Sequence, residues 1–219
     1  MLLGRSGSGK TTTLKLINRL LTPTQGRVDV NGTPNDQWDP IKLRRQIGYA
    51  IQEVGLFPHY TASKNVELIP RLEGWEKTRV RSRTEEVMRL VGLPPDQFSD
   101  RYPSQLSGGE RQRLGLARAL AADPPILLMD EPFGALDPLT RSRLQTDFRQ
   151  LQRTLRKTVV FVTHDIGEAL VLGDHIALME TGRVRGVYTP REFLTSTDPH
   201  VQEYLEAFRV NQQILGSEQ

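Results

Sequence analysis

Apolar positions along the chain change their spacing from one segment to the next. Near the N-terminus, apolar residues three and four positions apart predict a helix over residues 11–21, directly after a glycine-rich loop. Alternating polar and apolar residues predict a strand over residues 27–30 that enters a turn at Asn31-Gly32. An apolar run predicts a buried strand over residues 47–51. This first section is therefore predicted to be rich in β structure.

The pattern then becomes helical. Residues 63–122 have helical spacing interrupted by Pro70, Gly74 and Pro103, without a convincing strand, which predicts a helical insertion. After Pro124-Pro125, strands and helices alternate, which predicts an α/β layered core with a mainly parallel sheet. The predicted strands are 126–129, 158–162, 175–179 and 184–188, the predicted helices are 138–155 and 166–172, and two short helices are predicted within 190–208.

The predicted elements group into one domain with a subdomain. A chain of 219 residues has a usual single-domain length. We expect a core formed by residues 1–52 and 123–189, a helical subdomain over 53–122 and a C-terminal helical tail over 190–219.

Composition narrows the possible functions. The chain has no cysteine, which excludes disulfides and thiolate metal sites, and a cytosolic location is the default expectation. No run approaches the roughly 18 apolar residues that span a bilayer, so a membrane role requires a partner. The net charge is only +3, and acidic residues are interleaved with the arginines, which is typical of solvated helix faces. Nucleic acid is therefore not an expected partner.

The glycine-rich loop carries the first candidate chemistry. Gly4-Arg5-Ser6-Gly7-Ser8-Gly9-Lys10-Thr11 matches the eight-residue P-loop pattern immediately before a predicted helix. Its glycines let backbone N–H groups converge on phosphate oxygens, and the helix N-terminus adds a positive field. We expect Lys10 to reach the β- and γ-phosphates and Thr11 to bind Mg²⁺. A merely flexible glycine turn would not explain these two residues at these offsets.

A second candidate is the carboxylate pair that ends the strand at 126–129. Such a strand delivers Asp130 and Glu131 to the carboxyl edge of the sheet, where ligands bind in these folds. Asp130 suits a contact to Mg²⁺ through water, and Glu131 is placed to polarise an attacking water. Seen alone the pair would more often be a cap or turn, and the P-loop reverses that preference.

Leu106-Ser107-Gly108-Gly109-Glu110 supplies a hydroxyl and two glycine amides at another predicted helix N-terminus. This is a second phosphate-binding arrangement. Because one nucleotide rarely needs two such sites, Ser107 and Gly109 are expected to serve the γ-phosphate held by a partner subunit. The alternative is a simple helix cap.

With these motifs in order, the chain resembles the nucleotide-binding subunits of ATP-binding cassette transporters over essentially its whole length. Gln52 is similar to the family's Q-loop glutamine, Ala135-Leu136-Asp137 to its D-loop, and His164, after the Thr158–Thr163 strand, to its switch histidine. Each of these would be weak alone, since a lone glutamine or histidine at a strand end is usually structural. Asp137-Pro138 could also start the next helix.

The resemblance implies a P-loop NTPase (RecA-like) layered core with a mainly parallel sheet and an inserted α-helical subdomain. It implies ATP as substrate and Mg²⁺ as cofactor. The implied ATP-binding residues are Gly4, Ser6, Gly7, Ser8, Gly9, Lys10, Thr11 and Thr12. The implied catalytic residues are Glu131, His164 and Gln52, and the implied Mg²⁺ contacts are Thr11, Gln52 and Asp130. The signature residues Ser107, Gly108, Gly109 and Glu110 act on the partner's ATP, and Asp137 links the two sites.

The resemblance also implies the partners. Two such subunits close head to tail around two ATP molecules, at the cytoplasmic face of the membrane, on two permease subunits that work with an extracytoplasmic substrate-binding protein. A helix of the permease docks beside the segment from Glu53 to Tyr60, although Phe57 and Tyr60 could instead pack within the helical insertion. The amino-acid sequence of residues 47–60 and 70–75 is similar to that of ATPase subunits from importers of glycine betaine, choline and related osmoprotectants.

Two departures from the family stand out. Only Met1-Leu2-Leu3 precede the P-loop, so the N-terminal antiparallel β part, an adenine-stacking aromatic residue and most of the central strand are largely missing. Either the start codon is assigned too late, or the chain is a divergent member that needs its partners to fold. The chain also stops soon after the core, so an appended regulatory domain is not expected.

Three alternatives remain open from the sequence. The chain could energise import of another small solute, such as an amino acid. It could be a soluble cassette ATPase of the DNA-repair or translation kind, although it shows neither a coiled-coil insertion nor a second cassette. It could also be a non-catalytic nucleotide-binding scaffold, against which Glu131 and His164 both argue.

Overall fold

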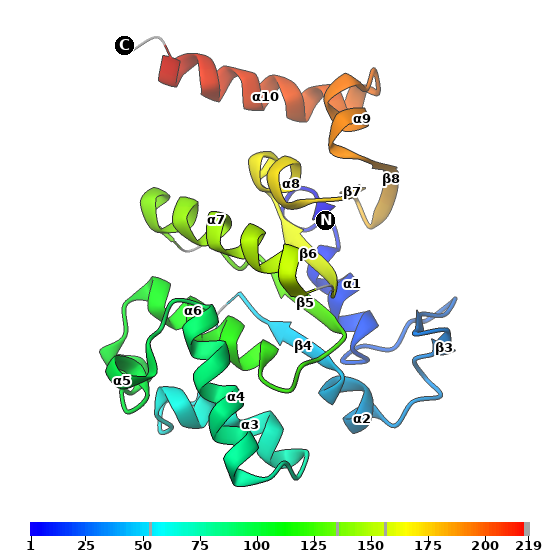
Figure 1. Ribbon diagram of the computed structural model, residues 1–219. Coiled ribbons are helices and arrows are strands. Elements are labelled where there is room, and N and C mark those ends of the chain that lie inside the picture. The colour runs from blue at the N-terminus through cyan, green and yellow to red at the C-terminus, as the bar shows by residue number, and fades with distance from the viewer. Residues whose placement is uncertain (53, 135, 156, 217–219) are drawn as a thin grey trace. The chain divides into compact units, whose positions relative to one another are not determined.

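A computed structural model describes residues 1–52, 54–134, 136–155 and 157–216. The chain forms two compact units. The first unit comprises residues 1–11 together with the chain from Val162 onward, and the second comprises Thr12–Phe161. Figure 1 shows the elements of both units in chain order by colour.

The first unit is a small sheet covered by helices. Strand β1 (Leu2–Leu3) pairs in parallel with the end of β6 (Thr158–Thr163) and with β7 (Ile176–Glu180), and β7 pairs antiparallel with β8 (Arg183–Tyr188). Its helices are α8 (Ile166–Leu172), α9 (Pro190–Thr195) and α10 (Pro199–Gly216). Their buried apolar side chains form one core, namely Leu3, Ile166, Ala169, Ile176, Leu178, Phe193, Val201 and Leu205.

The second unit places a parallel strand pair beside a group of helices. Strand β4 (Ile47–Ala50) pairs in parallel with β5 (Ile126–Asp130), with Ala50 opposite Met129, and β5 neighbours β6. Strands β2 (Asp29–Val30) and β3 (Thr33–Pro34) form a separate antiparallel pair. The helices are α1 (Lys10–Ile17), which begins in the first unit, α2 (Pro40–Arg45), α3 (Ala62–Leu72), α4 (Lys77–Leu90), α5 (Pro95–Phe98), the 3₁₀ turn η1 (Pro103–Gln105), α6 (Gly108–Leu120) and α7 (Pro138–Leu155).

Helices α3, α4 and α6 lie side by side, as Figure 1 shows. Behind β5, the rings of Phe133, Phe148 and Phe161 contact one another with centroids 5.6–6.2 Å apart. These three phenylalanines bring the turn after β5, helix α7 and strand β6 into one apolar cluster. The cluster fixes the strand end from which the predicted carboxylates emerge.

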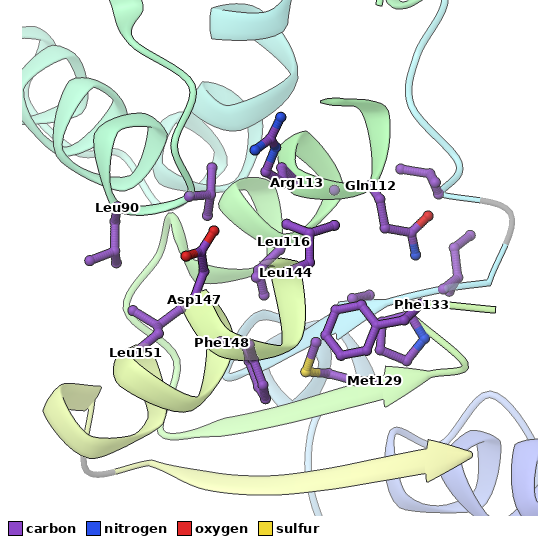
Figure 2. Close-up of a pocket in the computed structure, with 16 residues that line it drawn as sticks. Leu90, Gln112, Arg113, Leu116, Met129, Phe133, Leu144, Asp147, Phe148 and Leu151 are labelled. Carbon is purple, nitrogen blue, oxygen red and sulfur yellow. The ribbon is translucent and has the colours of Figure 1, made fainter. Parts of the chain in front are cut away.

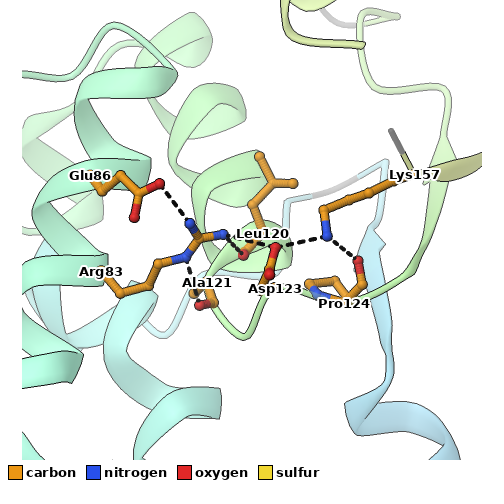
Figure 3. A network of polar contacts seen from close by, with 7 residues as sticks. All are labelled: Arg83, Glu86, Leu120, Ala121, Asp123, Pro124 and Lys157. Carbon is orange, nitrogen blue, oxygen red and sulfur yellow. Dashed lines mark hydrogen bonds and ion pairs between the residues drawn. The ribbon is translucent and has the colours of Figure 1, made fainter. Parts of the chain in front are cut away.

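A polar network fastens the C-terminal end of α6 (Figure 3). Arg83 of α4 donates to the carbonyl oxygens of Leu120 (3.0 Å) and Ala121 (3.3 Å), where an α-helix leaves acceptors unpaired. Asp123 lies between Arg83 (3.3 Å) and Lys157 (2.8 Å), and Lys157 also donates to the carbonyl of Pro124. The network therefore joins α4 to the connections that lead into β5 and β6.

Most predicted elements are confirmed within about two residues. The insertion is helical, without a strand among the described residues of 63–122, and the strand and helix alternation after Pro125 is present. In the first arginine-rich segment, Arg81 and Arg89 of α4 have exposed side chains and both form ion pairs with Glu85, which confirms the solvated-face interpretation there. Among the residues the structure describes, no helix is both long and apolar enough to cross a bilayer.

The bounds of two predicted helices are wrong, and one predicted strand is one residue too long. The first helix ends at Ile17, not at 21, because the buried side chain of Asn35 donates to the carbonyls of Leu16 and Ile17 and Arg19 turns into the left-handed region at φ +55°. The second tail helix is not short, since α10 extends from Pro199 to Gly216. The strand predicted over 47–51 ends at Ala50, because the carbonyl of Ile51 already closes a turn with the N–H of Val54.

Candidate functional site

The P-loop lies in the first unit, and its shape depends on two glycines in the left-handed region. Gly7 and Gly9 have φ values of +79° and +97°, which only glycine adopts readily. The ammonium of Lys10 donates to the carbonyls of Gly4 (2.8 Å) and Arg5 (2.9 Å), and the residue is 5% exposed. The loop therefore brings a buried cation and converging amides to the N-terminus of α1.

Close approach explains the first glycine of the loop. A Cβ at Gly4 would lie 2.3 Å from the carbonyl oxygen of Met179 in β7, so any other residue would push the loop off the strand. The N–H of Gly182 also donates to the carbonyl of Ser8 at 3.2 Å. The P-loop therefore packs against the end of β7 and the turn between β7 and β8.

The predicted site residues in and after the P-loop differ in their exposure to solvent. Ser6 and Gly7 are exposed, Ser8 is buried, Thr11 is half-buried, and Thr12, the first residue of the second unit, is exposed. His164 is exposed on the turn from β6 to α8. Its neighbour Thr163 accepts from the N–H of Asp165 at 2.9 Å and bonds to the buried Glu168, which orders the turn that presents the imidazole.

Asp130 ends strand β5 in the second unit with 4% exposure. The hydroxyl of Tyr49, from the neighbouring strand β4, hydrogen-bonds to its carboxylate. Burial, and then the charge and hydrogen bond of Asp130, raise the pKa of Tyr49 to about 12. Tyr49 therefore remains a neutral donor to this carboxylate at physiological pH. Sequence reasoning missed Tyr49, whose only signal was a tyrosine within a buried strand.

Gln52 and Glu131 are brought together. The amide Nε2 of Gln52 donates to Oε2 of Glu131 at 3.3 Å, across 79 positions of sequence. Glu131 has φ +44°, a left-handed conformation that is uncommon outside glycine, and the N–H of Gly134 donates to its carbonyl at 3.1 Å. Strained backbone of this kind is often found at functional sites. The turn aims the carboxylate at the glutamine that follows the adjacent strand.

The predicted signature segment begins helix α6. Ser107 is the N-cap, its Oγ accepting from the N–H of Glu110 (3.3 Å), while the carboxylate of Glu110 accepts from the N–H of Ser107 (2.7 Å). The bond from the Ser107 N–H is the main reason that the pKa of Glu110 is lowered. Ser107 and Glu110 therefore form a reciprocal cap at the start of α6. It does not remove an anion donor, because the hydroxyl of Ser107 can accept this bond and donate its own proton.

The glycines of the signature differ in their surroundings. A Cβ at Gly109 would lie 2.7 Å from the side chain of Thr140 in α7, whereas the space around Gly108 is open. Asp137 accepts from the N–H of Thr140 at 3.0 Å, which confirms that it caps α7. Of the predicted D-loop, Ala135 lies outside the described residues. Gly109 and Asp137 thus both meet the first turn of α7.

A hollow that is partly open to solvent lies in the second unit (Figure 2). It is mostly apolar and lies between β5, α6 and α7, beside the segment that follows Gln52. Its apolar lining includes Ile51, Val54, Leu90, Leu116, Phe133 and Phe148, and polar atoms come from Gln112, Arg113 and Asp147. Glu53, which sequence reasoning placed at the start of the docking segment, lies outside the described residues.

Comparisons with known proteins agree with these features. Residues 1–134 match the protein family described as ABC transporter. The chain belongs to the ABC transporter family. It is 49% identical, over 98% of its length and 56% of the relative's, to the glycine betaine/carnitine/choline transport ATP-binding protein OpuCA of Bacillus subtilis. It is 53% identical, over 89% of its length and 51% of the relative's, to the osmoprotectant import ATP-binding protein OsmV of Salmonella typhimurium.

Solved ABC cassettes share the fold. A post-hydrolysis dimer of the ATP-binding cassette MJ0796 with ADP and Pi is 37% identical and superposes with a TM-score of 0.77, covering 87% of this chain and 84% of that one. This likeness confirms the predicted P-loop NTPase class of the ABC chain. The chain spans about half the length of the curated relatives that it matches.

Proposed function

We propose that this ABC chain hydrolyses ATP to drive import of a quaternary ammonium osmoprotectant such as glycine betaine, carnitine or choline. The OpuCA and OsmV relatives are ATP-binding proteins of such systems. The observation that carries the catalytic part is the 3.3 Å contact between Gln52 and Glu131 at the ends of two adjacent parallel strands. The cargo rests on the relatives alone, because the ATP-binding chain does not meet the solute.

Each unit supplies its own set of catalytic groups. In the first, Lys10 and the amides of the P-loop bind the β- and γ-phosphates, and His164 contacts the γ-phosphate. In the second, Glu131 accepts a proton from the attacking water and Gln52 holds that carboxylate in its acceptor orientation. An amide donor on the carboxylate fixes its orientation, and a carboxylate can accept the proton of a water that it contacts.

The donor set fits Mg²⁺ as cofactor. Thr11 offers a hydroxyl, Asp130 a carboxylate and Gln52 an amide oxygen, and Mg²⁺ prefers such hard oxygen ligands together with substrate phosphates. Asp130 is nearly buried and already accepts a hydrogen bond from Tyr49, which keeps its oxygens oriented at the strand end. When bound, the ion would neutralise phosphate charge during the displacement.

A second copy of the chain is the proposed dimer partner. Ser107 and Gly108 are exposed at the N-terminus of the long helix α6, where an anion is favoured. Glu110 accepts the N–H of Ser107. The hydroxyl proton of Ser107 and the amide of Gly108 are then the groups proposed to donate to the γ-phosphate of the other copy. Asp137 would link the two sites across the interface.

The membrane partners are proposed from the apolar hollow. Ile51 and Val54 line it. Further along the same segment, Phe57 is 39% exposed and contacts the rings of His59 and Tyr60. An apolar, partly open surface of this kind fits a short helix of a permease subunit. The chain would then work at the cytoplasmic face of the membrane with two permeases and an extracytoplasmic binding protein.

Replacement of the water-activating carboxylate tests the proposal. Glu131→Gln should abolish phosphate release and leave a dimer that retains Mg·ATP, whereas Glu86→Gln, at a 62% exposed side chain on α4, should leave both unchanged. Phosphate release and size-exclusion chromatography with Mg·ATP measure the two effects. Unchanged release in Glu131→Gln would reject the assigned base, and failure to restore osmoprotectant uptake to a strain lacking its importer ATPase would reject the cargo.

A further inference from the structure

The segment after strand β4 has a backbone that ordinary residues avoid. Val54 and Gly55 are consecutive left-handed residues, with φ values of +56° and +53°. A β-branched residue is a genuine outlier in this region, so neighbouring contacts must hold it there. This turn begins only two residues after Gln52.

Helix α6 provides the contacts. The guanidinium of Arg118 donates to the carbonyls of Val54 and Gly55, each at 2.7 Å. One turn earlier on the same face, Gly115 leaves room for Val54, since a Cβ at Gly115 would lie 2.6 Å from Cγ1 of Val54. Desolvation lowers the pKa of Arg118, as expected for a guanidinium placed against the loop. We call Gly115 and Arg118 with these two carbonyls the α6 clamp.

The far end of the same segment is held by helix α3. Asn65, with no exposed surface, accepts from the N–H of Phe57 (2.8 Å) and donates to the carbonyls of Phe57 and Tyr60 (both 3.1 Å). Its amide also donates to the carbonyl of Thr61 at 3.1 Å. The segment from Val54 to Tyr60 is therefore held by two helices of the insertion.

We propose that Arg118 is a positioning residue that holds the amide of Gln52 against Glu131. This inference rests on the proposed function, because that function gives Gln52 and Glu131 their roles. The α6 clamp fixes Val54, and the hydrogen bond from the N–H of Val54 to the carbonyl of Ile51 ties it to the residue before Gln52. Ser107 is the N-cap of the same helix, so a displacement of α6 would move both the signature residues and the glutamine.

Hydrogen exchange tests the clamp without nucleotide. The N–H of Val54 donates to the carbonyl of Ile51 and is protected only while the turn persists. In the nucleotide-free full chain, Arg118→Ala should accelerate exchange of this amide roughly tenfold. Arg83→Ala is the matched control, because Arg83 also donates to two backbone carbonyls, those of Leu120 and Ala121, which lie outside the turn at Val54. It should leave this amide unchanged.

A kinetic cycle tests the positioning. Arg118→Ala should lower kcat for ATP about tenfold with little change in KM, and the Gln52→Ala/Arg118→Ala double variant should be no slower than Gln52→Ala. Arg118→Lys should recover part of kcat, since a lysine can replace one of the two bonds. Any loss caused by Arg83→Ala should instead multiply with that of Gln52→Ala.

The outcomes separate the two proposals. Unchanged exchange at Val54 in both Arg118→Ala and Arg118→Lys would overturn the clamp, and multiplicative losses of Gln52→Ala and Arg118→Ala would overturn the positioning role. If the unsubstituted chain hydrolysed no ATP, the proposed function would fail, while exchange at Val54 would still decide whether Arg118 holds the turn.

Discussion

Tyr49 hydrogen-bonds through its hydroxyl to the carboxylate of Asp130, and the two residues lie near the ends of adjacent parallel strands. The register of β4 against β5 produces this contact, because Tyr49 lies opposite Leu128, two positions before Asp130. A buried carboxylate thereby gains a neutral donor. The pair gives the strand edge its fixed geometry and makes the first prediction possible.

Stability should fall at alkaline pH through Tyr49. Its folded pKa of about 12 lies above the ordinary value of 10, so its contribution is complete below pH 10 and is lost as pH rises through 12. Urea unfolding of wild type and Tyr49→Phe at pH 8, 10 and 11 should show an advantage of wild type that shrinks with pH. Tyr102→Phe, at an exposed tyrosine, serves as control. A constant difference across this range would contradict the prediction.

Acid should weaken the network around Asp123. The hydrogen bond from Lys157 is the main reason that the pKa of Asp123 is lowered below its ordinary 3.8. The contribution is therefore present above pH 3.8 and is lost as pH falls through the folded pKa. Asp123→Asn, which also tolerates the left-handed backbone there, should cost at most about 1 kcal/mol at pH 7, because the side chain is 62% exposed.

Urea unfolding at pH 7 and pH 3 measures this difference, with Asp100→Asn as the exposed comparison. The gap between wild type and Asp123→Asn should be smaller at pH 3 than at pH 7. An equal gap at both values would assign the effect to something other than the charge of Asp123.

Gly74 should tolerate asparagine better than alanine. It follows α3 with φ +71°, and no atom lies within 4 Å of a Cβ built there, so only the backbone conformation opposes substitution. Gly74→Ala should cost about 1 kcal/mol of unfolding free energy, and Gly74→Asn clearly less. Thermal unfolding of the two variants compares them directly, and equal losses would show that the conformation is not the cause.

Gly115 should resist alanine although it lies within a helix. Alanine would gain up to about 1 kcal/mol of helix propensity. The overlap of its Cβ with Val54, 2.6 Å away in the present structure, should cost about 1–3 kcal/mol and prevail. Urea unfolding should therefore show a less stable Gly115→Ala variant and recovery when Val54→Ala is added. A single variant more stable than wild type would contradict this.

The site features that could be predicted from the sequence are those made by contiguous residues. The P-loop, the carboxylates that end β5 and the serine that begins α6 are contiguous patterns, and the structure has them at a loop, a strand end and a helix cap. The contacts that orient them have no such pattern. Tyr49 and Arg118 act through register and through backbone carbonyls 64 positions away, which a single sequence does not reveal.

The same reason explains the misplaced helix end. The spacing of apolar residues continues to Leu21, yet Asn35, in the turn after β3, donates to the last carbonyls of α1 and stops the helix at Ile17. A tertiary contact here overrides periodicity. Domain boundaries and the roles of individual site residues remain predictions for these experiments.

The ammonium of Lys10 is already stripped of bulk water by folding, with two carbonyl oxygens in place of a hydration shell. Phosphate binding therefore does not have to remove a full hydration shell from this ammonium. Dissolved ions also screen a buried charge much less than an exposed one. Nucleotide affinity at this loop should consequently respond to ionic strength far less than binding to an exposed lysine would.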